Sequence, residues 1–174
     1  SPGDVWNCSV RLYDGNDYSG WGNSTSLTIS NEILCYNCSD CSNKIQAYTG
    51  TGYSVLLNNT IWNASSTCIN FNGTDGVTFD CQGFIIDGNN SGYGISLPDV
   101  GTTESNNVQN CNIQEFSSNI YLRSAHYNNL TNIILSRGSS NAVYMYDSDH
   151  NNFYNITSYN HSSYFFYLDR VNYG

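Results

Sequence analysis

The chain has 174 residues, of which 39% are hydrophobic and only 11% are charged. Its 14 acidic and 5 basic residues give a net charge of −9, which argues against nucleic acid or anionic lipid as a partner, because both require a basic surface. No run of 18 apolar residues occurs, so the sequence predicts no membrane span. The hydrophobic fraction is too high for a disordered chain and predicts a folded domain.

Residues 1–34 are predicted to form a β-hairpin segment. Val5 to Tyr13 alternates apolar and polar residues as a strand does, Asp14 to Asp17 is a turn signal, and Ser24 to Ile29 is a second strand. A lone hairpin is marginally stable in water, so either it is the remainder of a domain cut in half, or it packs on the rest of the chain or completes a sheet of another subunit. The chain starts at Ser1 without methionine, and we expect a processed or truncated start.

Residues 35–49 form a cysteine-rich cap or linker. Cys35, Cys38 and Cys41 make two overlapping Cys-x-x-Cys steps, a spacing that also suits part of a zinc or iron–sulfur site. The second pair of ligands that such a site needs is missing nearby, and an oxidising location favours disulfides. We therefore expect disulfides, no metal and no cofactor, in a segment that covers one end of the following repeats.

Residues 50–174 contain a repeat. The strand centres Ile120, Val143 and Phe166 recur with a period of about 23 residues, which is typical of solenoids. The copies alternate apolar and polar residues with period two and lack helical spacing, which predicts β-strands. The fold class is therefore all-β: a parallel β-helix of about five coils, preceded by the hairpin segment, and the resemblance given below implies that it is right-handed. Stacked coils should give an inward ladder of Ile69, Ile95, Ile120, Val143 and Phe166, and further inward ladders of Leu122, Met145 and Leu168 and of Val108, Leu130 and Phe153.

Two segments carry a resemblance to known families. The stretch "GVTFDCQGFIIDGNNSGYGISL", with "NNVQNCNIQEFSSNIYL" and "NNLTNIILS", resembles the right-handed β-helix repeats of NosD-like and CASH-type secreted archaeal proteins over residues 45–174. That resemblance implies the fold, and it leaves function open because the repeat serves enzymes, binding proteins and structural shafts. The copper association of NosD finds no matching cluster of His, Met or Cys. Residues 1–30 resemble the last strands of a fibronectin-type or immunoglobulin-like domain.

Seven cysteines are candidates for disulfides. They are Cys8, Cys35, Cys38, Cys41, Cys68, Cys81 and Cys111. Cys81 and Cys111 occupy equivalent inward positions on adjacent coils, where either a disulfide or a stacked pair of free thiols fits. Seven is an odd number, so one thiol is unpaired or bonds to another chain, and Cys8 is our candidate.

Glycosylation sequons indicate an extracellular location at a cell surface. The 27 Asn and 36 Ser plus Thr would give roughly five or six Asn-x-Ser/Thr sequons by chance, and ten occur. They begin at Asn7, Asn23, Asn37, Asn58, Asn63, Asn72, Asn89, Asn129, Asn155 and Asn160. We expect covalent N-glycans on this protein.

Two rows of side chains should stack from coil to coil. The asparagine pairs at 106/107, 128/129 and 151/152 fall at one turn of each coil, where Asn tolerates a left-handed backbone and bonds to its neighbours, and we interpret them as structural. Tyr121, Tyr144 and Tyr167 should form an outward row. That row either stacks only with itself or serves as a binding or interface face for sugars or a subunit.

Catalytic chemistry has few candidates. The β-helix lyases and hydrolases use paired carboxylates or calcium beside an arginine, and the candidates here are Asp147, Asp149, His150, Arg123, Arg137 and Arg170. Asp147 and Asp149 lie at a predicted turn, where Asp is expected for backbone reasons. We predict no catalytic residues and no enzyme.

The sequence thus predicts an extracellular structural protein, a subunit of a surface fibre or surface layer assembled head-to-tail. Self is the expected partner, because the inward residues Phe166 and Leu168 end the last coil without a charged or amphipathic cap. A longer chain cut at Gly174 explains the same feature equally well. The alternatives are a carbohydrate-binding or adhesin module that uses the tyrosine row, and a polysaccharide lyase or glycoside hydrolase.

Overall fold

In a computed structural model, the chain divides into two compact units, Ser1–Asn31 and Glu32–Gly174. The structure describes residues 5–6, 9–11, 13–18, 20–23, 27–28, 31–50 and 52–171, with the backbone alone for residues 5, 6, 10, 22, 23, 27, 28 and 99–103. Cys8 and Asn7 lie outside the described residues. Glu32 to Leu34, assigned above to the hairpin segment, lie in the second unit.

The first unit is antiparallel. Strand β1 (Val5–Trp6) pairs with β4 (Leu27–Thr28), and β2 (Ser9–Val10) pairs with β3 (Gly22–Asn23). A bridge between Tyr13 and Tyr18 flanks the turn. The Arg11 guanidinium lies 3.9 Å from the ring centre of Tyr18 and 4.9 Å from that of Trp21, so one cation covers two exposed aromatic rings.

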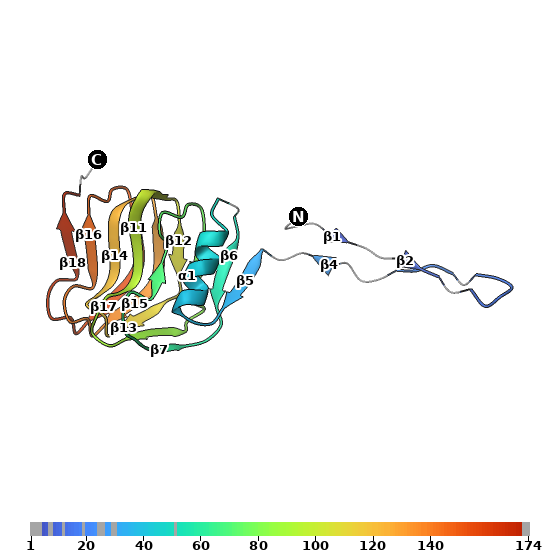
Figure 1. Cartoon of the computed structure of the whole chain (residues 1–174), viewed down its shortest axis with the longest axis horizontal. Helices are drawn as coiled ribbons and strands as arrows, with labels where there is room; N and C mark the ends of the chain where they lie inside the picture. The colour runs from blue at the N-terminus through green and yellow to red at the C-terminus, as the bar shows by residue number, and fades with distance from the viewer. Residues whose placement is uncertain are drawn as a thin grey trace. The chain divides into compact units, whose positions relative to one another are not determined.

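The second unit is a parallel β-solenoid, which confirms the predicted all-β parallel β-helix (Figure 1). It has about six turns, where the sequence predicted about five coils. Its first face contains β5 (Glu32–Cys35), β6 (Ser54–Leu57), β9 (Thr78–Asp80), β12 (Asn107–Gln109) and the first halves of β15 (Asn129–Ser136) and β17 (Asn152–Tyr159). The second face contains β7 (Ile61–Ala64), β10 (Ile85–Gly88), β13 (Asn112–Gln114) and the second halves of β15 and β17. The third contains β8 (Ile69–Asn70), β11 (Tyr93–Glu104), β14 (Ser118–His126), β16 (Val143–Tyr146) and β18 (Phe166–Asp169).

The predicted ladders are present in register. Ile95 pairs with Ile69 and Ile120, and Val143 pairs with Ile120 and Phe166. Leu130 likewise pairs with Val108 and Phe153 on the first face. The ladder side chains up to Val143 in the sequence are fully buried, because each coil covers the apolar edge of the next.

Asparagines turn one corner of the solenoid. Asn110, Asn132 and Asn155 have φ of 55°, 54° and 54°, in the left-handed region that Asn tolerates. The Nδ2 of Asn155 donates to Oδ1 of Asn132 at 2.9 Å, and that of Asn132 donates to Oδ1 of Asn110 at 3.2 Å. A single left-handed residue thus bends β15 and β17 from the first face onto the second.

A helix covers the N-terminal end of the solenoid. Helix α1 (Cys38–Ala47) begins at Asn37, whose Oδ1 accepts from the N–H of Asp40 at 2.9 Å, a typical N-cap. Its buried residues are Cys41, Ser42 and Ile45. The helix is an addition to the sequence-based description, which predicted a disulfide-bonded cap without a helix.

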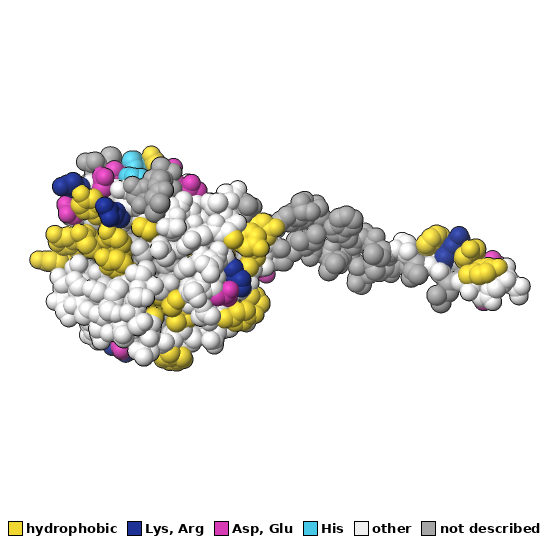
Figure 2. Space-filling view, viewed as in Figure 1, with side chains coloured by type: hydrophobic (Ala, Val, Ile, Leu, Met, Phe, Trp, Pro, Cys, Tyr) yellow, Lys and Arg dark blue, Asp and Glu magenta, His cyan; other side chains and the backbone are white. Residues whose placement is uncertain are grey.

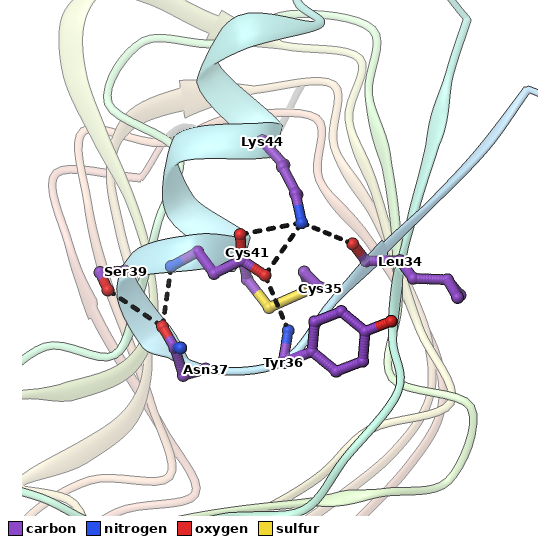
Figure 3. Close-up of polar contacts among 8 residues, drawn as sticks. Leu34, Cys35, Tyr36, Asn37, Ser39, Cys41 and Lys44 are labelled. Atoms are coloured by element: carbon purple, nitrogen blue, oxygen red, sulfur yellow. Dashed lines mark hydrogen bonds and ion pairs between the residues drawn. A yellow bond between two sulfur atoms is a disulfide. The ribbon is translucent and has the colours of Figure 1, made fainter.

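Charged and sulfur groups fix this cap (Figure 3). The Lys44 ammonium donates to the backbone oxygen of Leu34 at 2.8 Å and forms an ion pair with Asp40 at 2.8 Å. The hydrogen bond from Lys44 lowers the pKa of the Asp40 carboxyl. The Asp40 carboxylate also accepts from the N–H of Tyr36 at 3.0 Å, so α1 is bonded to the segment that follows β5.

Three disulfides join the six cysteines that the structure describes. Cys35–Cys41 and Cys38–Cys68 attach α1 to β5 and to the start of β8. Cys81–Cys111 joins two adjacent coils with a Cα–Cα distance of 4.8 Å, which resolves in favour of a disulfide the alternative left open above. Because these six cysteines bond among themselves, none of them is available to Cys8.

Candidate functional site

The third face of the solenoid presents an aromatic surface with a charged margin. Inward residues of β14 such as Ile120 and Leu122 are fully buried, so the residues between them point outward. We call this outer surface the tyrosine face. It consists of Tyr93, Tyr121, Tyr144, Tyr167, Arg123, Tyr146 and Asp169.

The tyrosine rings contact one another from coil to coil. Tyr144 pairs in register with Tyr121 and Tyr167, as predicted, and its ring centre lies 5.3 Å and 5.1 Å from theirs in edge-to-face contacts. Tyr93 adds a fourth ring, stacked on Tyr121 at 4.3 Å with an interplanar angle of 12°. The rings form a continuous aromatic row along the solenoid axis, a geometry that aromatic pairs favour.

Burial in this row affects the phenol groups. It raises the pKa of Tyr93, Tyr121 and Tyr144, because desolvation disfavours the phenolate. The Arg123 guanidinium opposes the rise in the pKa of Tyr121, and the Asp169 carboxylate adds to the rise at Tyr144. The phenols are therefore neutral hydrogen-bonding groups at neutral pH.

A second row lies beside the aromatic one. Arg123 pairs in register with Tyr146, and Tyr146 pairs with Asp169, so a cation, an aromatic ring and an anion occupy three successive coils. Arg170 places its guanidinium 5.2 Å from the ring centre of Tyr146. Figure 2 shows hydrophobic side chains gathered at the end of the solenoid that carries β16 and β18, with basic and acidic side chains at their margin.

The last coil is open on its outer side. Strands β17 and β18 each pair on one side, with β15 and β16, and among the described residues nothing pairs with their other edges. Leu168 continues the inward ladder of Leu122 and Met145, yet it is 40% exposed, whereas Leu122 is fully buried. Phe165, which precedes β18, is 41% exposed. We call this surface the open coil.

Of the residues weighed for catalysis, all but Arg137 lie near the ends of neighbouring third-face strands. Arg123 pairs in register with Tyr146, which precedes Asp147. The N–H of Asp147 donates to the backbone oxygen of Asp169, which precedes Arg170. Asp147, Asp149 and His150 lie in one turn, where the N–H of Asp149 donates to Nδ1 of His126 at 3.0 Å and His150 stacks on Tyr127 at 4.8 Å. Arg137 lies elsewhere and forms an ion pair with Glu115 at 2.9 Å. Among the described residues, no group of three or more His, Cys, Asp or Glu side chains is placed to hold a metal ion.

The described sequons lie away from the tyrosine face. None of the ten falls within β8, β11, β14, β16 or β18. Asn37, Asn58, Asn63, Asn72, Asn89, Asn155 and Asn160 are exposed, and Asn129 is partly buried. The side chain of Asn23 lies outside the described residues. No helix in the described part of the chain has the length and apolarity to cross a bilayer.

Comparison with protein-family models, curated proteins and solved structures found no match to this chain. The resemblance to NosD-like and CASH-type proteins therefore rests on the quoted segments alone, and the structure supports its fold component, the parallel solenoid.

Sequence reasoning missed Tyr93 and the row that contains Arg123, Tyr146 and Asp169. Tyr93 precedes Tyr121 by more than one repeat period, and its register partner is Ser118. The charged row could have been found, since its three members recur with the same period as Ile120, Val143 and Phe166. Considered one at a time, Arg123 is only a candidate for catalysis, and Tyr146 and Asp169 belong to no motif that would indicate a function.

Proposed function

We propose that this protein is an extracellular structural protein that assembles with copies of itself into a surface fibre or surface layer. Three disulfides among the described residues support an oxidising location, and one of them, Cys81–Cys111, joins neighbouring coils of the solenoid. The exposed sequons support N-glycans on the same protein. The resemblance of residues 45–174 to secreted β-helix surface proteins points to the same location.

The observation that carries the proposal is the open coil. An exposed strand edge presents unpaired N–H and C=O groups and readily pairs with another strand. Here two such edges, on β17 and β18, border the exposed side chains of Phe165 and Leu168. A partner that adds strands to this coil would satisfy the backbone and bury the apolar side chains together.

The opposite end of the solenoid is a poor match for the open coil. Helix α1 covers part of that end and exposes the polar residues Ser39 and Asn43 beside the apolar Ala47 and Leu34. Direct stacking of one solenoid end on the next would bury these polar groups against Phe165 and Leu168 without compensating bonds. We therefore propose that the joint includes the N-terminal unit of a neighbouring copy.

The N-terminal unit has the properties of a strand donor. Its β1–β4 and β2–β3 pairs have two strands each, and two-stranded hairpins are marginally stable alone. Tyr13, Tyr18 and Trp21 are 58%, 53% and 63% exposed. Adding this hairpin to the edge of β18 or β17 would provide aromatic side chains to cover the open coil.

The test is light scattering and sedimentation of the native glycoprotein at micromolar concentration. Phe165→Lys together with Leu168→Lys should abolish assembly, because two cations on the open coil resist burial. Trp62→Lys is the matched control, since Trp62 is 66% exposed on β7, which lies at the opposite end of the sheet from β17, and its replacement adds one of the same cations. A chain that starts at Asn31 should fold and remain dispersed. Undiminished assembly of that shortened chain would refute the hairpin joint.

A second candidate function is carbohydrate binding by the tyrosine face. The continuous row of rings with neutral phenols supports it, because aromatic rings stack on the apolar faces of sugars and phenols bond to hydroxyls. Glycan-array binding that is lost in Tyr121→Ala and Tyr144→Ala would establish it. Absence of binding on a broad array would exclude it.

A further inference from the structure

We propose that the tyrosine face is a contact surface between two copies of this chain, related by a twofold axis that runs along the strands at the level of β16. This inference rests on the proposed self-association and names the surface that pairs copies side by side. It differs from the joint at the open coil, because it uses a sheet face rather than strand edges.

The first argument is the distribution of sequons. Strands of the first and second faces carry Asn63, Asn129 and Asn155, and further sequons lie in the turns. The third face carries none within its strands. N-glycans are bulky and solubilising, so a glycosylated solenoid would keep this one face free for close contact with protein.

The second argument is charge complementarity of the face with itself. The row of Arg123, Tyr146 and Asp169 places a cation one coil below an aromatic ring and an anion one coil above it. The two charges are two coil steps apart, about 10 Å at the usual strand spacing, which is too far for an ion pair within one copy. A second copy can supply the opposite charge to each.

A twofold axis along the strands brings these charges together. Such an axis at the level of β16 reverses the order of coils, so β14 of one copy meets β18 of the other and β16 meets β16. Arg123 then faces the second copy's Asp169, and Asp169 faces its Arg123. A closed twofold contact repeats each interaction, so two ion pairs form from one row.

The aromatic row obeys the same symmetry. Tyr144 lies on β16 between Tyr121 and Tyr167, at nearly equal ring distances of 5.3 Å and 5.1 Å. Reversing the coil order therefore places Tyr144 against its own copy and Tyr121 against the second copy's Tyr167, while Tyr93 lies outside the contact. Tyr146 meets its own copy at the axis, where the Arg170 guanidinium already lies 5.2 Å from its ring. Tyr and Arg are also enriched among the hot-spot residues of protein interfaces.

The experiment is sedimentation of the full chain at micromolar concentration with two charge reversals. Arg123→Asp and Asp169→Arg should each convert dimer to monomer, because each places like charges opposite one another twice. An equimolar mixture of the two variants should recover a dimer, since each copy then opposes unlike charges at both positions. Arg137→Asp is the matched control, because it removes an arginine charge that lies outside the tyrosine face, and it should leave the dimer intact.

The outcomes separate this pairing from the proposed fibre. Dimers that respond to the charge reversals while no fibre forms would support the tyrosine contact and refute the fibre. Fibres that persist in all three variants, with no dimer step in sedimentation, would refute the tyrosine contact alone. A monomeric wild-type chain whose tyrosine face binds a glycan would overturn the contact and assign that face to carbohydrate. A mixture of Arg123→Asp and Asp169→Arg that stays monomeric would overturn the twofold arrangement.

Discussion

The side-chain Oδ1 of Asn128 accepts two hydrogen bonds from Asn106 on the coil before it, one from the backbone N–H at 3.0 Å and one from Nδ2 at 3.1 Å. Asn151 does the same for Asn128, at 2.9 Å and 3.0 Å. Asn106 and Asn128 are almost completely buried. The ladder therefore satisfies buried polar groups with identical groups from the next coil, as the structural interpretation of the asparagine pairs predicted. The left-handed backbone expected in the pairs lies instead at the residue before each pair, Ser105, Tyr127 or His150.

Replacing Asn128 tests this ladder. Asn128→Ala removes the acceptor for the buried N–H of Asn106 and leaves it unpaired, so we expect a loss of about 2–3 kcal/mol in the free energy of unfolding. Urea denaturation measures it. Asn152→Ala is the control, because Asn152 is exposed and gives a single amide bond to Asn129, and we expect a loss below about 1 kcal/mol. Equal losses in both variants would contradict the ladder.

The disulfide between Cys81 and Cys111 joins adjacent coils across a sequence separation of 30. Chain-entropy arguments give about 3–4 kcal/mol for a loop of this length, so Cys81→Ala with Cys111→Ala should lower the free energy of unfolding by that amount.

The matched comparison is Cys35→Ala with Cys41→Ala, which opens a loop with a sequence separation of 6. The same argument gives about 2 kcal/mol for it. Guanidinium denaturation of both double variants in non-reducing buffer makes the comparison. A larger effect from the shorter loop would show that constraint of the unfolded chain is not the main contribution.

His161 should make stability depend on pH. Its Nδ1 accepts a hydrogen bond from the N–H of Gly138 at 3.1 Å, and burial lowers its pKa. A base with a lowered folded pKa binds protons more tightly when unfolded, so this contribution to stability is present above about pH 6.5 and is lost as the pH falls through the folded pKa.

Thermal denaturation between pH 8 and pH 5 measures this contribution. His161→Gln should show a smaller decrease in Tm toward low pH than the wild type. His150→Gln replaces an exposed imidazole as the control and should follow the wild-type curve. An equal decrease in Tm for His161→Gln and the wild type would show that His161 does not contribute to the pH dependence of stability.

Sequence periodicity was sufficient to predict the ladders but not the number of faces. Ile120, Val143 and Phe166 recur at equal intervals, and each lies in register with the next. The second face went unrecognised because β15 and β17 turn the corner through one left-handed residue, Asn132 or Asn155. A corner of one residue contains no Gly, Pro or loop that would mark a turn.

Neither helix α1 nor the row of Arg123, Tyr146 and Asp169 could be predicted from individual residues, and the reasons differ. Helix α1 has a sequence of low helix propensity, rich in Cys, Ser and Asn, and the Asn37 cap and two disulfides hold it in place. The Asn37 cap and the two disulfides, rather than helix propensity, therefore stabilise the helical conformation of this segment. The alignment of Arg123 with Asp169 requires the coil register, since neither residue is informative by itself.

A glycan placed on the tyrosine face should block contact there. Tyr146→Asn creates the sequon Asn-Asp-Ser at residues 146–148, within the row that carries Arg123 and Asp169. In a glycosylating host, the variant should be monomeric in sedimentation, because a bulky sugar excludes a second copy. Tyr146→Gln lacks the sequon and controls for loss of the ring. Retained dimers in chains whose new sequon carries a glycan would place the contact elsewhere.

The central claim, that this solenoid assembles with copies of itself, is tested most directly by negative-stain electron microscopy of the native glycoprotein at micromolar concentration. We expect ordered fibres or sheets with a fixed repeat along the solenoid axis, absent from Phe165→Lys with Leu168→Lys. Dispersed single particles in the wild-type protein, at concentrations where it remains folded, would contradict the account.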